Sequence, residues 1–180
     1  MSERIEIRLA GTGGQGMILA GIVLADAAIR DGKQVVQTQS YGPEARGGAS
    51  RAEIIIADGP IHYPKVLDAD ILLCMSQVAC DRYGMMMRRG GLLIVDNNQV
   101  SRTPTAYAVQ APITQLAREK TGREITANVV ALGVLVGLTG VVSRSSLEAA
   151  VRARAPKGTK DMNLEALAAG FEAAQELMQE

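Results

Sequence analysis

Residues 5–16 read IEIRLAGTGGQG, an apolar run that leads directly into a cluster of glycines. The apolar run predicts a buried first strand, and the pattern from 17 to 29 predicts a helix after it. Between them, Gly11, Gly13 and Gly16 have the G-x-G-x-x-G spacing of a strand-to-helix turn, where glycines permit positive φ and close approach of the backbone. The free N–H groups at the start of such a helix attract an anion, typically a phosphate. The stretch therefore predicts an α/β fold of the Rossmann-like kind.

The end of the second predicted strand bears on what this loop binds. A nicotinamide fingerprint needs an acidic residue there, to hold the ribose hydroxyls. The strand is expected at Gln34–Gln39, and Ser40 and Tyr41 follow it, whereas Asp31 comes too early and Glu44 too late. Three interpretations stay open: dinucleotide binding, a turn that only packs backbone, and another anionic group or a partner subunit at the loop.

The composition indicates one domain over residues 1–180. Hydrophobic residues make up 47% of the chain, and 19 basic residues balance 19 acidic ones with no long run of either sign. The balance argues against nucleic-acid and membrane-surface partners. The N-terminus lacks the pattern of a secretory signal, and the longest apolar stretch, 127–142, is broken by glycines and too short for a membrane span. A cytoplasmic location is therefore expected.

Apolar runs and helical patterns alternate along the whole chain. The runs are nearly continuous, which is typical of strands buried on both faces, so we expect a mostly parallel sheet with helices on both faces. The expected strands are Ile5–Ala10, Gln34–Gln39, Ala52–Ala57, Ile71–Met75, Leu92–Asp96 and Ala106–Gln110. The expected helices are Met17–Ile29, Gln77–Arg88, Pro112–Glu119, Ala127–Leu138, Ser145–Arg154 and Asn163–Met178.

Residues that could bind a metal are few. Cys74 stands in an apolar strand and Cys80 in a predicted helix, and His62 is the only histidine. The cysteine spacing fits neither a zinc site nor an iron–sulfur site. We expect no metal site and no redox centre in this chain, and we expect Cys74 to be a buried, inert thiol.

The segment from Ser40 to Ser50, SYGPEARGGAS, is unusually rich in special residues. Tyr41 and a proline stiffen its start, and Gly47 and Gly48 let the chain turn into the third strand. Because it leaves the carboxyl ends of the sheet, where α/β proteins bind ligands and partners, we expect a docking role. A solvated loop whose Glu44 and Arg46 only pair on the surface is the alternative.

A third segment, NVVALGVLVGLTG from 128 to 140, predicts a helix with glycines on one face. Gly133 and Gly137 lie four residues apart, and each costs a helix roughly 1 kcal/mol relative to alanine. That cost indicates that another backbone packs against them. The pattern leaves open whether this backbone belongs to the same chain or to another subunit.

Together these segments resemble one family. The motifs are GTGGQG at 11–16, SYGPEARGG at 40–48, HYP at 62–64, MSQ at 75–77, the Asn128 helix with its ALG, and KG…N at 157–163. They resemble the γ subunit of the 2-oxoacid:ferredoxin (acceptor) oxidoreductases over nearly the whole chain. The separate short chain and its VVQTQSYGPEARGGAS stretch are most similar to the 2-oxoglutarate branch, and the pyruvate, branched-chain and indolepyruvate branches stay open as alternatives.

The resemblance implies a reaction and a set of partners. A 2-oxoacid is oxidatively decarboxylated with coenzyme A to acyl-CoA, carbon dioxide and reduced ferredoxin, with thiamine diphosphate, magnesium and iron–sulfur clusters as cofactors. It assigns those cofactors to α, β and ferredoxin-like δ subunits, and it implies that this chain alone binds none of them and docks onto the catalytic subunits. Self-association is a further expectation.

The resemblance also implies roles for particular residues, none of them catalytic. It implies cofactor binding, by an anion-facing loop, for Gly11, Gly13, Gly14, Gln15, Gly16 and, through a bidentate contact, Arg46. It implies subunit contact for Tyr41, Glu44, Gly47, Gly48 and Asn128. The alternatives in function are a stand-alone nucleotide- or CoA-binding protein and an NAD(P)-dependent dehydrogenase.

Overall fold

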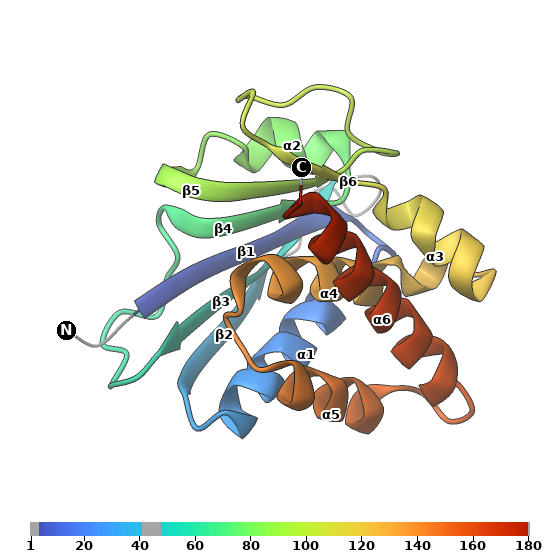
Figure 1. Ribbon diagram of the computed structural model, residues 1–180. Helices are drawn as coiled ribbons and strands as arrows, with labels where there is room; N and C mark the ends of the chain where they lie inside the picture. Colours follow the sequence, from blue (N-terminus) through green and yellow to red (C-terminus); the bar gives the residue numbers. More distant parts are fainter. Residues whose placement is uncertain (1–3, 41–47, 180) are drawn as a thin grey trace.

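Six strands form one sheet with the order β2-β3-β1-β4-β5-β6 (Figure 1). The computed structural model describes residues 4–40 and 48–179. The strands are β1 (Arg4–Thr12), β2 (Gln34–Ser40), β3 (Ala49–Ala57), β4 (Ala69–Cys74), β5 (Met87–Asp96) and β6 (Val109–Ala111). Only β3 runs against its neighbours, since it pairs antiparallel with both β1 and β2 while the other pairs are parallel. The predicted mostly parallel α/β sheet is therefore confirmed.

Helices cover the two faces of the sheet unequally. They are α1 (Met17–Arg30), α2 (Gln77–Tyr83), α3 (Ile113–Thr121), α4 (Ala127–Thr139), α5 (Arg144–Arg154) and α6 (Lys160–Leu177), with a short 3₁₀ turn, η1 (Glu124–Thr126). All but α2 share one large apolar core with the front face of the sheet as Figure 1 is drawn, and α2 lies on the opposite face. Helices on both faces were expected, but the uneven division was not.

The boundary between α2 and β5 differs from the prediction. The sequence predicts a helix over Gln77–Arg88, whereas α2 ends at Tyr83 and Met87 already pairs with Ala69 as the start of β5. Close packing accompanies the early end, since a Cβ on Gly84 would lie 2.5 Å from the carbonyl oxygen of Cys80. The last strand also lies later than expected, over Val109–Ala111.

Glycines bring α4 and α6 into backbone contact. A Cβ on Gly133 would lie 2.5 Å from the carbonyl oxygen of Leu167, and one on Gly170 would lie 2.2 Å from that of Val130. The α-carbons of Gly133 and Gly170 therefore face each other across the contact. The backbone that the glycines of α4 were predicted to meet thus includes α6 of the same chain.

One buried ion pair lies on the sheet face that carries α2. Arg8 of β1 and Glu53 of β3 are register partners, and their side chains are joined by a 2.9 Å hydrogen bond. Arg8 is only 1% exposed and also donates to the carbonyl oxygens of Val66 and Met86. A charge so buried is tolerated because its N–H groups have partners. Arg8 thereby joins the sheet to the connection before β4, which contains Val66, and to the turn before β5, which contains Met86.

The carboxylate of Asp31 connects the end of α1 to the start of α5. It accepts hydrogen bonds of 2.6 Å from the N–H and the hydroxyl of Ser143 and from the hydroxyl of Ser146. Partial burial pushes the pKa of Asp31 upward, but these hydrogen bonds outweigh it and hold the pKa below its ordinary value. The ionised form of Asp31 therefore stabilises the folded chain.

Gly170→Ala should destabilise the fold, because its methyl group would collide with the backbone of α4. Overpacking of this kind costs about 1–3 kcal/mol, which urea unfolding would detect as a lower midpoint. Gly13→Ala is the matched control, since a Cβ at Gly13 meets nothing within 4 Å. Equal midpoints for Gly170→Ala and the unchanged chain would contradict the close contact.

Asp31→Asn should lower the free energy of unfolding by about 1 kcal/mol at neutral pH. A carboxyl group whose pKa is depressed by folding stabilises the fold above its unfolded pKa, and this stability is lost as the pH falls through the folded pKa. The gap between the two proteins should therefore close in acid, as measured by urea unfolding across pH. Asp68→Asn, at an exposed position, is the control, and a gap independent of pH would refute the argument.

Candidate functional site

The glycine loop lies at the edge of the sheet where the parallel strands end, between β1 and α1. Gly14 and Gly16 have φ of 89° and 75°, the left-handed region that side chains other than glycine rarely adopt. Gly16 is the N-cap of α1, with no side-chain cap and no acidic residue in the first turn. The first N–H groups of this 14-residue helix are therefore left for solvent or an anion, together with the positive end of the helix dipole.

The four glycines of the motif have different surroundings. Gly11 is packed, since a Cβ there would lie 2.5 Å from Oε1 of Gln15, whereas Gly13 and Gly14 have nothing within 4 Å of the corresponding point. At Gly16 a Cβ would lie 2.6 Å from Nδ2 of Asn128. Gly13 and Gly14 are thus the residues at which a ligand could approach the backbone.

The side chain of Gln15 is used inside the chain. Its Oε1 accepts a 2.8 Å hydrogen bond from the N–H of Thr12, and its Nε2 donates one of 2.8 Å to the carbonyl oxygen of Met75. Gln15 therefore fastens the loop to the end of β4. With both ends of its side chain used in this way, Gln15 offers an anion its backbone, and its predicted place in an anion-facing loop stays a prediction.

Asn128 lies next to the loop although 112 residues separate it from Gly16. Its Nδ2 donates to the carbonyl oxygen of Gly16 at 3.4 Å, and the residue is 6% exposed. The structure thus brings two of the predicted segments together. The role of Asn128 in subunit contact stays a prediction.

Most of the predicted docking segment lies outside the described residues. The predicted site residues outside the described ranges are Tyr41, Glu44, Arg46 and Gly47. Gly48 is described and stands directly before β3. Their predicted roles in docking and anion binding stay predictions.

A small cavity adjoins the glycine loop, and the sequence interpretation missed some of its lining. Its volume is about 210 Å³, and it is lined by Gly14, Gln15, Met75, Thr114, Glu124, Ile125 and Ala127. Asp96, fully buried at the end of β5, accepts hydrogen bonds from the N–H and the hydroxyl of Thr114 and so fixes the start of α3 here. The sequence signal that could have pointed to Asp96 is its place as an acidic residue directly after the apolar run LLIV.

The two cysteines are free thiols in the small core beneath α2. A hydrogen bond with Cys80, together with burial, raises the pKa of Cys74 far above its ordinary value, so that this thiol stays protonated. The same hydrogen bond lowers the pKa of Cys80.

Over 4–40 and 48–179, no three His, Cys, Asp or Glu side chains are grouped to hold a metal ion. Within the same ranges, no helix is both long and apolar enough to span a membrane.

Comparison with known proteins places this fold and glycine loop in one family. The family described as pyruvate ferredoxin/flavodoxin oxidoreductase matches residues 6–173. The chain therefore belongs to the pyruvate ferredoxin/flavodoxin oxidoreductase family. It is 50% identical to 2-oxoglutarate synthase subunit KorC of Methanocaldococcus jannaschii, over 97% of this chain and 96% of that protein.

Two further relatives are similar over nearly the whole of this chain. A solved structure of a keto/oxoacid ferredoxin oxidoreductase γ subunit from Geobacter sulfurreducens superposes with a TM-score of 0.88 at 47% identity, covering 97% of this chain and 98% of that one. Ketoisovalerate oxidoreductase subunit VorA of Methanothermobacter thermautotrophicus is 36% identical over 96% of this chain but only 37% of its own length. The resemblance to a γ subunit of the 2-oxoglutarate branch is confirmed, and the dehydrogenase and stand-alone alternatives are not favoured.

Gln15→Leu should loosen the glycine loop, because the N–H of Thr12 and the carbonyl oxygen of Met75 each lose a partner. An unsatisfied buried polar group costs about 1–3 kcal/mol. The expected result is faster amide hydrogen exchange at Thr12 and a lower unfolding midpoint. Gln99→Leu, at an exposed position on the same edge, should change neither, and unchanged exchange at Thr12 in Gln15→Leu would refute the fastening role.

Proposed function

We propose that this chain is the γ subunit of a complex that converts 2-oxoglutarate and coenzyme A to succinyl-CoA, carbon dioxide and reduced ferredoxin. Its role is to position and dock, and the reacting groups belong to other subunits. The observation that carries the proposal is the 50% identity to KorC over nearly the full length of both chains. A chain with two cysteines also lacks the four thiolates that an iron–sulfur cluster usually requires.

The length of the relatives supports the need for partners. VorA contains a similar domain as about a third of a longer chain, whereas KorC is nearly the same length as this protein. We infer that separate α and β subunits, with thiamine diphosphate and magnesium, and a ferredoxin-like δ subunit with the iron–sulfur clusters complete the enzyme around this chain. We place the complex in the cytoplasm.

Within this complex, the glycine loop is our candidate for guiding coenzyme A. The open backbone at Gly13 and Gly14 and the uncapped start of α1 are suited to an anionic group such as a phosphate. Arg46 is proposed to add a bidentate contact to the same group. A 2-oxoglutarate:ferredoxin oxidoreductase from Magnetococcus marinus has been solved with coenzyme A and succinyl-CoA bound; at 23% identity its TM-score of 0.86 supports the shared fold alone.

Native affinity purification of this chain from its own cells should test the assembly. We expect co-purifying subunits with thiamine-diphosphate and ferredoxin-like sequences, the absorbance of iron–sulfur clusters, and coenzyme A-dependent oxidation of 2-oxoglutarate. The isolated chain should show no turnover. A pyruvate, branched-chain 2-oxoacid and indolepyruvate panel controls for the branch, and a colourless chain without partners would overturn the proposal.

A further inference from the structure

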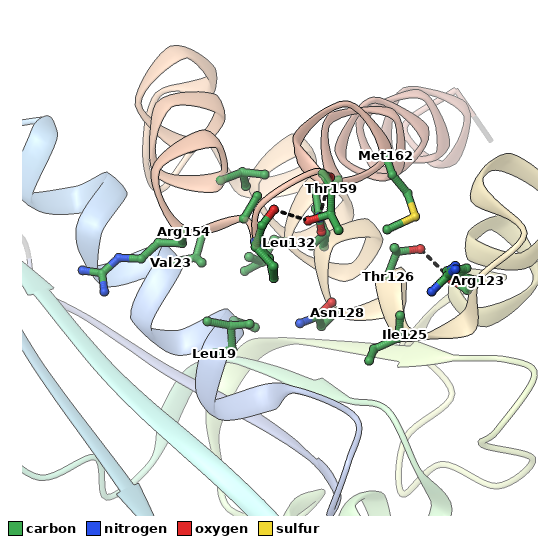
Figure 2. Close-up of a pocket in the computed structure, with 16 residues that line it drawn as sticks. Leu19, Val23, Arg123, Ile125, Thr126, Asn128, Leu132, Arg154, Thr159 and Met162 are labelled. Carbon is green, nitrogen blue, oxygen red and sulfur yellow. Dashed lines mark hydrogen bonds between the residues drawn. The ribbon is translucent and has the colours of Figure 1, made fainter.

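A second cavity lies among the helices, on the other side of the start of α4 from the glycine loop. It has a volume of about 260 Å³ and lies between α1, α4 and the connection from α5 to α6 (Figure 2). We call it the interhelical cavity. Asn128 and Leu132 of α4 form its buried floor, and Leu19 of α1 and Ile125 of η1 stand at its sides. Val129 of α4 also lines it.

The lining of the interhelical cavity is mostly apolar, with a few polar side chains among the apolar ones. Leu132 is 1% exposed at the floor, whereas Leu19 is 44% and Ile125 is 72% exposed at the sides. Large apolar side chains left in water at the mouth of an apolar cavity favour an apolar occupant, since each Å² removed from water contributes roughly 25 cal/mol. At about 30 Å³ for each water-sized group, such as a methylene, the interhelical cavity has room for roughly eight or nine of them.

Two basic side chains, Arg123 and Arg154, line the cavity, and further basic residues stand beside its lining residues in the sequence. The segment from 151 to 161, VRARAPKGTKD, forms much of the cavity's roof and contains four basic residues and one acidic residue, in a chain of zero net charge. Of the basic side chains, Arg154 lies 3.5 Å from Asp26, but no carboxylate of the described part pairs with Arg123, Lys157 or Lys160. Arg123 lines the cavity, and the two lysines adjoin the lining residues Pro156 and Thr159. An anionic group at the mouth would find several exposed cations.

The polar side chains of the lining are mostly used inside the chain. Nδ2 of Asn128 donates to the carbonyl oxygen of Gly16, and the hydroxyls of Thr126 and Thr159 donate to the carbonyl oxygens of Arg123 and Pro156. A peptide segment would bring an N–H and a C=O with every residue, which these side chains could not satisfy. An alkyl chain needs no hydrogen bonds, so it fits the lining better.

We infer that the interhelical cavity binds a small amphipathic anion, whose chain of about eight carbons enters between α1 and α4. Its phosphate or carboxylate head lies at Arg123 and the lysines of the α5–α6 connection. The site is distinct from the glycine loop, from which the first turn of α4 separates it, and the inference goes beyond the proposed function.

Calorimetric titration of the full chain tests this inference, with octyl phosphate and octanoate as probes. Both should bind at one site per chain, at least tenfold more tightly than octanol, and octyltrimethylammonium should not bind. The relative affinities of the two anions distinguish a phosphate head from a carboxylate. Binding of octanol as tight as that of both anions, or no saturable binding, would overturn the inference.

Three variants locate the site. Ala155→Trp fills the mouth and should weaken octyl phosphate at least tenfold, and Arg123→Glu combined with Lys157→Glu should do the same without affecting octanol. Arg89→Glu, an exposed cation on β5, is the matched control and should leave binding unchanged. If Ala155→Trp does not fold, as judged by circular dichroism, the charge variant still decides.

The native complex provides the last comparison. It should bind octyl phosphate as the free chain does. Binding to the free chain alone would show that a partner subunit fills the cavity, and it would overturn the assignment to a small molecule. Unchanged affinity in both the Ala155→Trp and the charge variants would place the probe elsewhere and would also overturn it.

Discussion

The close approach of α4 and α6 is the constraint on which the arrangement of the helices depends. Gly133 and Gly170 let the two backbones touch, and this contact allows α4 to lie buried between α6 and the rest of the core. A helix that is apolar on all sides, such as α4 from Val129 to Val136, is stable only where it is covered all round. A larger residue at either glycine would separate α6 from α4 and expose the sequence that most needs burial.

The position of α4 in turn determines what surrounds the glycine loop. Its first turn brings Asn128 to the carbonyl oxygen of Gly16, and η1 before it brings Ile125 to both cavities. The loop therefore has neighbours from β4, α3 and α4, and Gln15 fixes its own position against β4. A helix-packing contact formed by two glycines is thus connected, through one buried helix, to the edge of the sheet where the family's motifs lie.

The sequence could predict what local patterns encode. The apolar run before the glycines, the helix after them and the family resemblance were all confirmed. The antiparallel direction of β3 could not be predicted from the sequence, because its apolar residues do not differ from those of a parallel strand. Met85 to Met87 suit a helix or a strand equally, so the end of α2 depended on tertiary contacts that sequence alone does not show. The internal hydrogen bonds of Gln15 could not be predicted, because its two partners, Thr12 and Met75, come together only in the fold.

The ion pair between Arg8 and Glu53 makes these two positions depend on each other. Arg8 is 1% exposed, and it donates to the carbonyl oxygens of Val66 and Met86 as well as to the carboxylate of Glu53. Removing one partner of a buried ion pair leaves the other charge uncompensated at a cost of about 3–5 kcal/mol, whereas replacing both by apolar residues of similar volume is often neutral. Arg8 and Glu53 are therefore expected to be exchanged together rather than one at a time as relatives of this chain diverge.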